Sequence, residues 1–412
     1  MPSEFPRAAI SRRTSLRLVG TGVGGLVTWA GMPISLARAA TEKRFVVVIL
    51  RGALDGLAAV PPYADRDYNM QRGALAFADP DSAEGALDLD GKFGLNPALR
   101  PLHEMYRAGE MLVVHAVASS YRSRSHFDGQ DLLENGTMSP RGAGDGWLNR
   151  ALALIGSPDR RLGLAVGQTV PLLLRGSVPV GSWAPQQLPD VDGDFLAQLA
   201  KIYRRDPALG PALAEGLRVQ KMSDEVLGED KRMPGGPVRG AQAIRAAAGA
   251  LGKLLAAKDG PRIGVLQAGG WDTHANQGVL IGRLAAALKT LADALATLKT
   301  GLGPAWRDTV VAVVTEFGRT VAINGSNGTD HGTAGVAFLL GGSVNGGRVV
   351  ARWPGLGPAQ LFEGRDLAPT TDLRAVIKGV LADHLGLLRD ALDRAVFPDS
   401  ESVVPLADLV RA

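Results

Sequence analysis

The 412-residue chain contains no cysteine. This absence excludes disulfide bonds and metal sites built on thiolates. Hydrophobic residues make up 46% of the chain and charged residues 21%, which is ordinary globular composition at a length that can bury a large core. We therefore expect a fold held together by its core, with any metal bound through oxygen and nitrogen.

The chain after residue 39 also lacks a net charge. Of the 45 basic and 41 acidic side chains, five arginines and one glutamate precede Ala40, which leaves 40 of each sign. The basic isoelectric point is therefore mostly a property of the N-terminal segment, and nucleic acid is not expected as a partner. The 53 glycines and 25 prolines lie at the ends of apolar runs rather than in low-complexity tracts. No internal repeat or linker divides the chain.

The N-terminal segment lacks a hydrophobic run long enough for a stable membrane span. Its weakly apolar stretch, roughly residues 18–36, holds five glycines between Gly20 and Gly31. This stretch follows the pair Arg12-Arg13 and ends at Ala37-Arg-Ala39, whose small residues predict cleavage after Ala39. A membrane anchor is the alternative. The pattern favours a twin-arginine signal peptide over residues 1–39, with the twin-arginine translocation machinery as a partner and a periplasmic location.

Continuous apolar runs, typical of strands buried on both faces, recur along the rest of the chain. They cover Arg44–Leu50, Met111–Ala118, Leu162–Val166, Val170–Leu174, Arg262–Gln267, Val310–Thr315 and Val336–Leu340. The third and fourth could pair as a hairpin. Helical patterns alternate with the runs, and residues 175–260 are predicted to form a mainly helical insertion. This alternation predicts an α/β fold with a mostly parallel sheet covered on both faces, in a single domain over residues 40–412.

Carboxylates and imidazoles follow several of these runs. In a parallel sheet such strand ends meet at one edge, so groups far apart in sequence can converge. Oxygen and nitrogen ligands without sulfur suit Zn²⁺, Mn²⁺ or Mg²⁺, and two ions can hold the attacking and leaving oxygens of a phosphoryl or sulfuryl transfer. Taken singly, each group could instead be a surface histidine or a helix cap. The candidates are Asp55, Ser125, His126, Asp272, His274, Glu316, Asp330 and His331.

Several blocks of sequence resemble the DUF1501 family of exported proteins of uncharacterised function. They are Leu50–Gly56, Arg124–Asp131, Gly146–Arg150, Gly269–His274, Thr315–Thr320, Thr329–Gly332 and Thr370–Arg374. That family is in turn distantly similar to the alkaline phosphatase and sulfatase superfamily. The resemblance implies an alkaline-phosphatase-like three-layer α/β/α sandwich, with metals at the carboxyl ends of the strands.

The resemblance also implies roles for single residues. Ser125 resembles a helix-opening nucleophile, although a serine before a helix is also a routine N-cap. Arg122 or Arg124 would hold substrate oxygens, and His126 is a candidate proton donor. The implied metal ligands are Asp55, Asp272, His274, Glu316 and His331, and Asp330, beside His331, is a further candidate ligand.

Two departures limit this comparison. Phe317 stands where the phosphatases have a histidine, so the second metal position loses an imidazole, and the expected content is one or two divalent ions (Zn, Mn, Mg or Ca). Without a cysteine or a matching serine motif, a formylglycine sulfatase mechanism is not expected. The sequence thus favours an exported metal-dependent hydrolase of small phosphate or sulfate esters, attacked in line by a serine or a metal-activated water. The alternative is a non-catalytic exported protein that keeps the fold to bind a metal or a partner.

Overall fold

The computed structural model describes residues 42–411 except 81, 83, 156–161, 186–191 and 229–239. The described residues all belong to one compact unit, Ala40–Ala412. The signal peptide predicted for residues 1–39 lies outside them and stays a prediction. Within the described part of the chain, no helix has the length and apolar character needed to cross a membrane.

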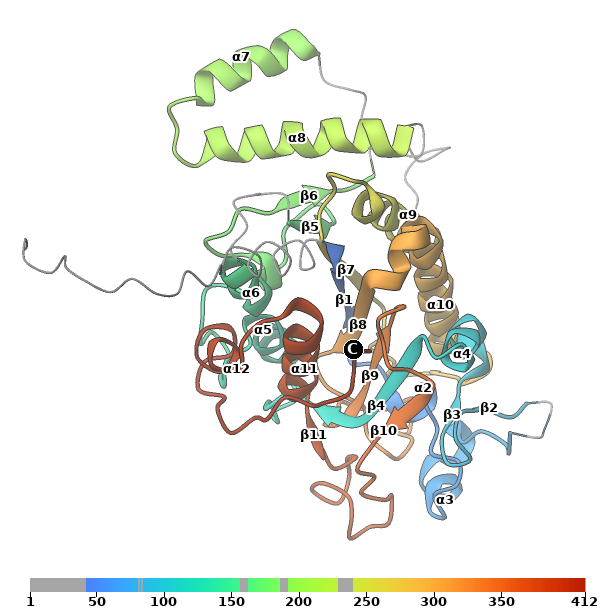
Figure 1. Ribbon diagram of the computed structural model, residues 1–412. Helices are drawn as coiled ribbons and strands as arrows, with labels where there is room; N and C mark the ends of the chain where they lie inside the picture. The colour runs from blue at the N-terminus through green and yellow to red at the C-terminus, as the bar shows by residue number, and fades with distance from the viewer. Residues whose placement is uncertain are drawn as a thin grey trace, which may run out of the picture. The chain divides into compact units, whose positions relative to one another are not determined.

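A nine-stranded sheet forms the centre of the described part (Figure 1). Its strands lie in the order β10-β4-β9-β8-β1-β7-β5-β6, and β11 pairs with β4 outside this path. Every pair is parallel except the two that β9 makes with β4 and β8. The predicted mostly parallel sheet is therefore confirmed. The strands are β1 (Arg44–Arg51), β4 (Met111–Ala118), β5 (Gly163–Val166), β6 (Gly181–Trp183), β7 (Ile263–Gly269), β8 (Thr309–Thr315), β9 (Gly335–Leu340), β10 (Arg348–Val350) and β11 (Thr371–Asp372).

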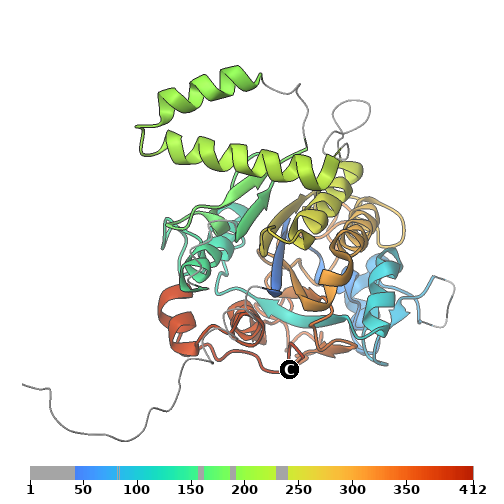
Figure 2. The ribbon, with the colours of Figure 1, turned by 45° about the horizontal axis from the view of Figure 1, so that its top comes forward.

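Helices cover both faces of this sheet because its central strand is apolar on both sides. Along β1, Val46, Val48 and Leu50 pack into one hydrophobic cluster and Phe45 and Ile49 into another. Successive side chains of a strand point to opposite faces, so the two clusters are the two sides of the sheet. Figure 2 shows β1 in the middle of this arrangement. The α/β/α sandwich expected from the sequence is confirmed.

The first cluster is completed by α4, α9 and α10, and the second by α6 and α11. Short elements at the edges are α2 (Gly56–Ala59), α3 (Tyr68–Arg72), α12 (Arg389–Ala391) and the hairpin of β2 (Leu87–Asp88) and β3 (Gly94–Leu95). The longer helices are α4 (Arg100–Arg107), α5 (His126–Asn135), α6 (Trp147–Ile155), α7 (Gly193–Tyr203), α8 (Leu209–Leu227), α9 (Ala241–Ala256), α10 (Arg283–Leu302) and α11 (Leu373–Leu385).

The region after β5 differs from the sequence prediction. Val170–Leu174 is not a strand, because only Leu172–Leu174 is regular and it forms a 3₁₀ turn. Pro171 has no amide hydrogen to donate to a neighbouring strand, which disfavours strand pairing there. Consequently β5 forms no hairpin and pairs in parallel with β6. Residues 175–260 contain α7, α8 and α9 as well as β6, an edge strand of the central sheet.

Three of the six histidines lie away from the strand ends that carry polar groups. His103 lies on α4, and its Nε2 contacts the Asp88 carbonyl at 2.8 Å. His115 is buried in β4 and His384 is buried on α11. The other three histidines converge at one place.

Candidate metal site

Strands β7, β1 and β8 are adjacent and parallel, so their carboxyl ends meet at one edge of the sheet. Glu316 follows β8 directly, and Asp272 stands three residues after the end of β7. The turn after β1 fits closely between them. Gly52 has φ +120°, its amide donates to Glu316 Oε1 at 2.8 Å, and a Cβ there would lie 2.7 Å from the Asp272 amide nitrogen. A glycine at this position therefore lets the two acidic loops approach each other.

His126 reaches this edge from the first turn of α5. Its ring stacks on Phe317, with the centroids 5.0 Å apart and the planes at 26°. Gly129 makes this approach possible, because a Cβ there would lie 3.0 Å from two atoms of the Phe317 ring. His126 Nδ1 contacts Glu316 Oε1 at 2.8 Å. Phe317 thus supports an imidazole that comes from α5.

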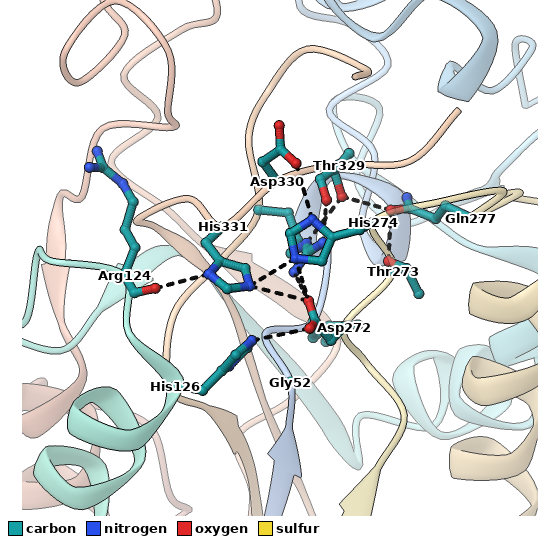
Figure 3. Close-up of polar contacts among 12 residues, drawn as sticks. Gly52, Arg124, His126, Asp272, Thr273, His274, Gln277, Thr329, Asp330 and His331 are labelled. Atoms are coloured by element: carbon teal, nitrogen blue, oxygen red, sulfur yellow. Dashed lines mark hydrogen bonds and ion pairs between the residues drawn. The ribbon is translucent and has the colours of Figure 1, made fainter. Parts of the chain in front are cut away.

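Asp272 is the centre of the cluster (Figure 3). Its Oδ1 lies 2.9 Å from His274 Nε2 and 3.3 Å from His331 Nε2. Its Oδ2 lies 3.5 Å from His126 Nε2. The donor atoms of His126, Asp272 and His331 all lie within 4.8 Å of one another, as those of a metal site must.

Each of the three histidines has its Nδ1 next to an oxygen acceptor. For His126 and His331 the hydrogen of the neutral ring therefore belongs on Nδ1 and the lone pair on Nε2, whereas His274 has a carboxylate oxygen beside each ring nitrogen. Metal-binding histidines commonly have this outer support, which fixes the tautomer and the ring orientation. The Nδ1 contacts are His126 with Glu316 Oε1 at 2.8 Å, His331 with Arg124 O at 2.9 Å, and His274 with Asp330 Oδ1 at 3.0 Å.

The Nε2 atoms fit a cation better than they fit one another. His274 Nε2 and His331 Nε2 lie 3.0 Å apart, and when both rings carry their hydrogen on Nδ1 their lone pairs face each other. His126 Nε2 is buried and has no hydrogen-bond partner. Tetrahedral zinc with bonds of about 2.0–2.1 Å separates its ligand atoms by roughly 3.3 Å. The contacts of 2.9–3.5 Å around Asp272 are therefore of the size that such a group requires.

The charges of the site follow from its hydrogen bonds. The bond to Glu316 raises the pKa of His126. Burial by itself would raise the pKa of Glu316, but the bonds from His126, Gln130 and the Gly52 amide outweigh it and hold that pKa below its usual value. Burial lowers the pKa of His331. The site thus combines the ionised Glu316 carboxylate with the His331 imidazole, whose neutral form burial favours.

Arg319 is a buried cation at this site to which the sequence prediction gave no role. Its Nη1 donates to Asp272 Oδ1 at 2.6 Å, and its Nε donates to Thr329 Oγ1 at 3.2 Å. Burial alone would raise the pKa of Asp272, but the bond from Arg319 and its charge lower it. Arg319 therefore keeps Asp272 anionic and ties it to the loop that carries His331. The only signal in the sequence was its place in the Thr315–Thr320 block.

Asp55 lies behind the cluster rather than within it. It is 1% exposed and caps α2, with Oδ1 accepting from the Ala58 amide at 3.1 Å. Its Oδ2 accepts from Arg72 Nη2 at 2.6 Å and from Gln277 Nε2 at 2.7 Å. Gln277 Oε1 in turn accepts from the Thr329 hydroxyl at 2.7 Å, which joins Asp55 to the metal-site loops through buried polar groups.

Ser125 stands at the N-cap position of α5, next to His126. Its side chain makes no capping hydrogen bond, and its backbone amide donates to the Tyr121 hydroxyl at 3.1 Å. The guanidinium of Arg124 points away from the cluster, with Nε 2.8 Å from Asp366 Oδ2 and Nη2 2.5 Å from Glu363 Oε2 (Figure 3). Arg122 donates to carbonyl oxygens of its own loop. Both arginines are thus held by partners within the chain.

The site lies within the part of the chain that a known family model matches. Residues 116–396, more than half of the chain, match DUF1501, described as a protein of unknown function. The chain belongs to the DUF1501 family. Among curated proteins, no sequence matches this DUF1501 chain.

Several solved structures are similar to this DUF1501 protein at low identity. The PsFucS1 sulfatase from Pseudoalteromonas sp. is 12% identical, with a TM-score of 0.41 over 92% of this chain and 77% of that one. The C-terminal periplasmic domain of EcEptC from Escherichia coli, in complex with Zn, is 12% identical, with a TM-score of 0.38 over 86% of each chain. The phosphonate monoester hydrolase of Agrobacterium radiobacter is 15% identical, with a TM-score of 0.33 over 84% of this chain and 74% of that one.

Proposed function

We propose that this DUF1501 protein is a metal-dependent hydrolase of phosphate or sulfate esters. The observation that carries the proposal is the convergence of three imidazole Nε2 atoms on Asp272, each ring anchored through Nδ1. His126, Asp272 and His331 would hold a divalent ion, and His274 contacts two of them. Glu316 and Asp330 would not bind the ion but would orient the imidazoles of His126 and His274. When bound, the ion would act as a Lewis acid on a phosphoryl or sulfuryl oxygen.

The ligand types also indicate which metal and how many ions. Imidazole nitrogen suits Zn²⁺ and Mn²⁺, whereas Ca²⁺ and Mg²⁺ prefer sites made of oxygen. A second ion at Asp55 would have to break the buried contacts of that carboxylate with Arg72 and Gln277. We therefore propose one Zn²⁺ or Mn²⁺ ion, with Asp55 in a structural role.

Attack on the ester would come from Ser125 or from a water molecule. Ser125 Oγ makes no capping bond, stands at the N-terminus of α5 and adjoins His126. The partial positive charge of a helix N-terminus stabilises negative charge that develops there. If Ser125 attacks, its Oγ forms a bond to phosphorus or sulfur, the ester oxygen leaves as an alcohol, and the hydroxyl proton passes to a base in the site. Water then attacks the phosphorus or sulfur, which releases phosphate or sulfate and restores the serine hydroxyl. If water attacks, Ser125 only orients it.

The test is hydrolysis of 4-nitrophenyl phosphate, bis(4-nitrophenyl) phosphate and 4-nitrophenyl sulfate by the protein with added Zn²⁺ or Mn²⁺. We expect turnover of at least one substrate, its loss in His331→Ala, and a fall of about 10²-fold or more in kcat for Ser125→Ala if the serine attacks. An unchanged kcat of Ser125→Ala would indicate that water, and not Ser125, is the nucleophile. No turnover of any of the three by metal-loaded protein would contradict the hydrolase.

A second candidate is a non-catalytic metal-binding or partner-binding protein. The observation that favours it is the engagement of Arg124 with Asp366 and Glu363, because the guanidinium next to Ser125 in the chain is then not available for substrate oxygens. Stoichiometric metal binding together with no hydrolysis would support this candidate.

We also propose that the protein is exported by the twin-arginine machinery and works in the periplasm. The support is Arg12-Arg13 and the small residues at Ala37 and Ala39. N-terminal sequencing of the periplasmic protein should begin at Ala40, and Arg12→Lys with Arg13→Lys should abolish export. A mature protein that retains its first residues in the cytoplasm would contradict this proposal.

A further inference from the structure

A cavity of about 500 Å³ opens at the same edge of the sheet as the metal site. It lies where β5, β6 and β7 end, and its walls are the first turns of α9 and the middle of α10. Cavities of about 300–1,000 Å³ are the usual size for small-molecule sites. Nothing in the proposed metal chemistry uses this space.

The cavity suits an uncharged, apolar ligand. None of the described residues that line it carries a charged side chain; most are alanine, glycine, leucine, isoleucine or valine. Thr290 and Gln168 are its polar residues besides Gln267, whose side chain accepts from Arg51 Nε at 2.6 Å on the other face of the sheet. Moving a charged group into such surroundings without a partner costs several kcal/mol, whereas an aryl or branched alkyl group gains from leaving water.

The cavity is joined to the metal site by a short, rigid loop. Trp271 lines the cavity and directly precedes Asp272, and its indole is fixed by a 3.0 Å bond from Nε1 to the Ala268 carbonyl. Adjacent strands lie about 4.8 Å apart, so the end of β5, which borders the cavity, is one strand spacing from the end of β7. One molecule can therefore reach both places.

The space between the two places is open. Gly269, which lines the cavity and ends β7, and Gly270 precede Trp271 and Asp272, and both glycines are exposed. A Cβ added at either glycine would meet no heavy atom of the described residues within 4 Å. The turn between the cavity and Asp272 is therefore open to solvent and has room for part of a ligand.

We infer that this cavity binds an aryl or branched alkyl group of the substrate, and thereby selects esters with a bulky apolar part. That the bound group belongs to an ester rests on the proposed function. The existence of the cavity and its preference for uncharged apolar molecules are independent of the proposed function.

The first test uses the uncharged fluorescent probe N-phenyl-1-naphthylamine with the full-length protein. We expect one saturable binding site, the same with and without EDTA. Ala287→Phe places a large side chain in the cavity and should raise Kd at least tenfold. The matched control Ala286→Phe lies one position away on α10, is exposed and does not line the cavity, so its Kd should stay within twofold. Absence of saturable binding, or an unchanged Kd for Ala287→Phe, would overturn the inference.

A second variant keeps the inference testable if Ala287→Phe does not fold. Gly269 has room for a side chain and no positive φ, so Gly269→Leu should fold and place a leucine at the end of the cavity that is next to Trp271. The melting temperature of each variant is measured alongside binding. If Ala287→Phe has a lower melting temperature than the wild type, the test rests on Gly269→Leu. An unchanged preference of Gly269→Leu for bulky esters would then overturn the inference.

The second test compares hydrolysis of 4-tert-butylphenyl phosphate with that of phenyl phosphate. We expect the ratio of their kcat/KM values to exceed one in the wild type and to fall at least tenfold in Ala287→Phe. A wild-type ratio of one would overturn the link to the substrate. Probe binding without any hydrolysis would contradict the proposed function but would leave the cavity as a binding site. Failure of the proposed function and failure of the cavity inference therefore give different results.

Discussion

At the scale of single residues, each site histidine has its Nδ1 committed to a protein oxygen, and in His126 the other ring nitrogen has no hydrogen-bond partner. For His126 the committed contact is Nδ1 with Glu316 Oε1 at 2.8 Å, and the free atom is the buried, unpartnered Nε2. Glu316 is itself fully buried and also accepts from the Gly52 amide and from Gln130 Nε2. The carboxylate that orients the imidazole is thus held in place by other bonds.

We expect Glu316→Gln to weaken metal binding by about 10–100-fold, the usual effect of removing an outer carboxylate from a ligating histidine. The amide is neutral and supports His126 less well than the carboxylate. Isothermal titration with Zn²⁺ measures the change. Asp293→Asn, which removes an exposed partner of Lys289 on α10, is the matched control and should leave the affinity unchanged. Equal affinities for Glu316→Gln and the wild type would contradict the proposed role of Glu316.

Asp55 should behave differently from the acids of the cluster. It forms a fully buried ion pair with Arg72, and removing one partner of such a pair costs about 3–5 kcal/mol because the other charge stays buried without compensation. We therefore expect Asp55→Asn to lower the free energy of unfolding by about that amount and to leave Zn²⁺ affinity within twofold. Denaturant unfolding and zinc titration measure the two effects. A large loss of zinc affinity with unchanged stability would make Asp55 a ligand.

At the scale of elements, the site depends on how closely α5 packs against the end of β8. Gly129 is the point of contact, since a Cβ there would lie 3.0 Å from the Phe317 ring and 3.4 Å from Glu316 Cβ. His126 is one turn earlier on the same helix. Any shift of α5 therefore moves an imidazole relative to Asp272.

We expect Gly129→Ala to weaken zinc binding measurably, because either Phe317 or α5 must yield by a few tenths of an ångström. Its effect on stability should be small, since the helical preference for alanine, about 0.5–1 kcal/mol, offsets the crowding. The control is Gly216→Ala on α8, where a Cβ meets nothing within 4 Å among the described residues. That variant should gain about 0.5–1 kcal/mol of stability with unchanged zinc affinity. An unchanged zinc affinity of Gly129→Ala would show that the close packing of α5 against Phe317 is not needed for metal binding.

The elements themselves were mostly predictable from sequence. The buried strands β1, β4, β7, β8 and β9 are continuous apolar runs, and this pattern is local. Val170–Leu174 has the same apolar character but forms a 3₁₀ turn at Leu172–Leu174, because Pro171 and the tertiary surroundings outweigh the local preference. Short apolar runs do not identify a strand by themselves.

The candidate site was predictable in part. Asp272, His274, Glu316, Asp330 and His331 stand after strands or in the next loop, and parallel pairing brings such positions together. Sequence gave His126 the role of a proton donor, whereas the structure groups it with Asp272 and His331. That placement depends on the stacking of its ring on Phe317, a contact between residues 191 positions apart in the chain that no local pattern encodes. The same holds for Arg319 and its bond to Asp272.

At the scale of the whole molecule, two histidines far from the site link stability to pH. Burial lowers the pKa of His115 to about 4 and that of His384 to about 4, from the ordinary value of 6.5. His115 Nε2 lies 3.0 Å from the Val60 carbonyl, and His384 Nε2 lies 2.8 Å from the Arg44 carbonyl. Both rings are therefore neutral in the folded protein at neutral pH.

Between pH 6.5 and 4 the unfolded chain binds more protons at these two rings than the folded protein does. The free energy of unfolding should therefore decrease as the pH falls through this range, by up to roughly 3 kcal/mol for each ring. Unfolding measured at pH 7 and pH 5 should show the decrease in the wild type and a smaller one in His115→Gln with His384→Gln. The partly exposed His103 gives the control, His103→Gln. A double variant with the same pH dependence as the wild type would contradict the assignment.

The central claim is that His126, Asp272 and His331 hold one divalent ion, and metal analysis of the purified mature protein tests it most directly. We expect about one equivalent of Zn²⁺ or Mn²⁺ in the wild type, a melting temperature that rises when either ion is added to the stripped protein, and loss of both effects in His126→Ala. Stripped protein that binds neither ion and shows no thermal shift would contradict the claim. Equal metal content in His126→Ala and the wild type would contradict the role of His126.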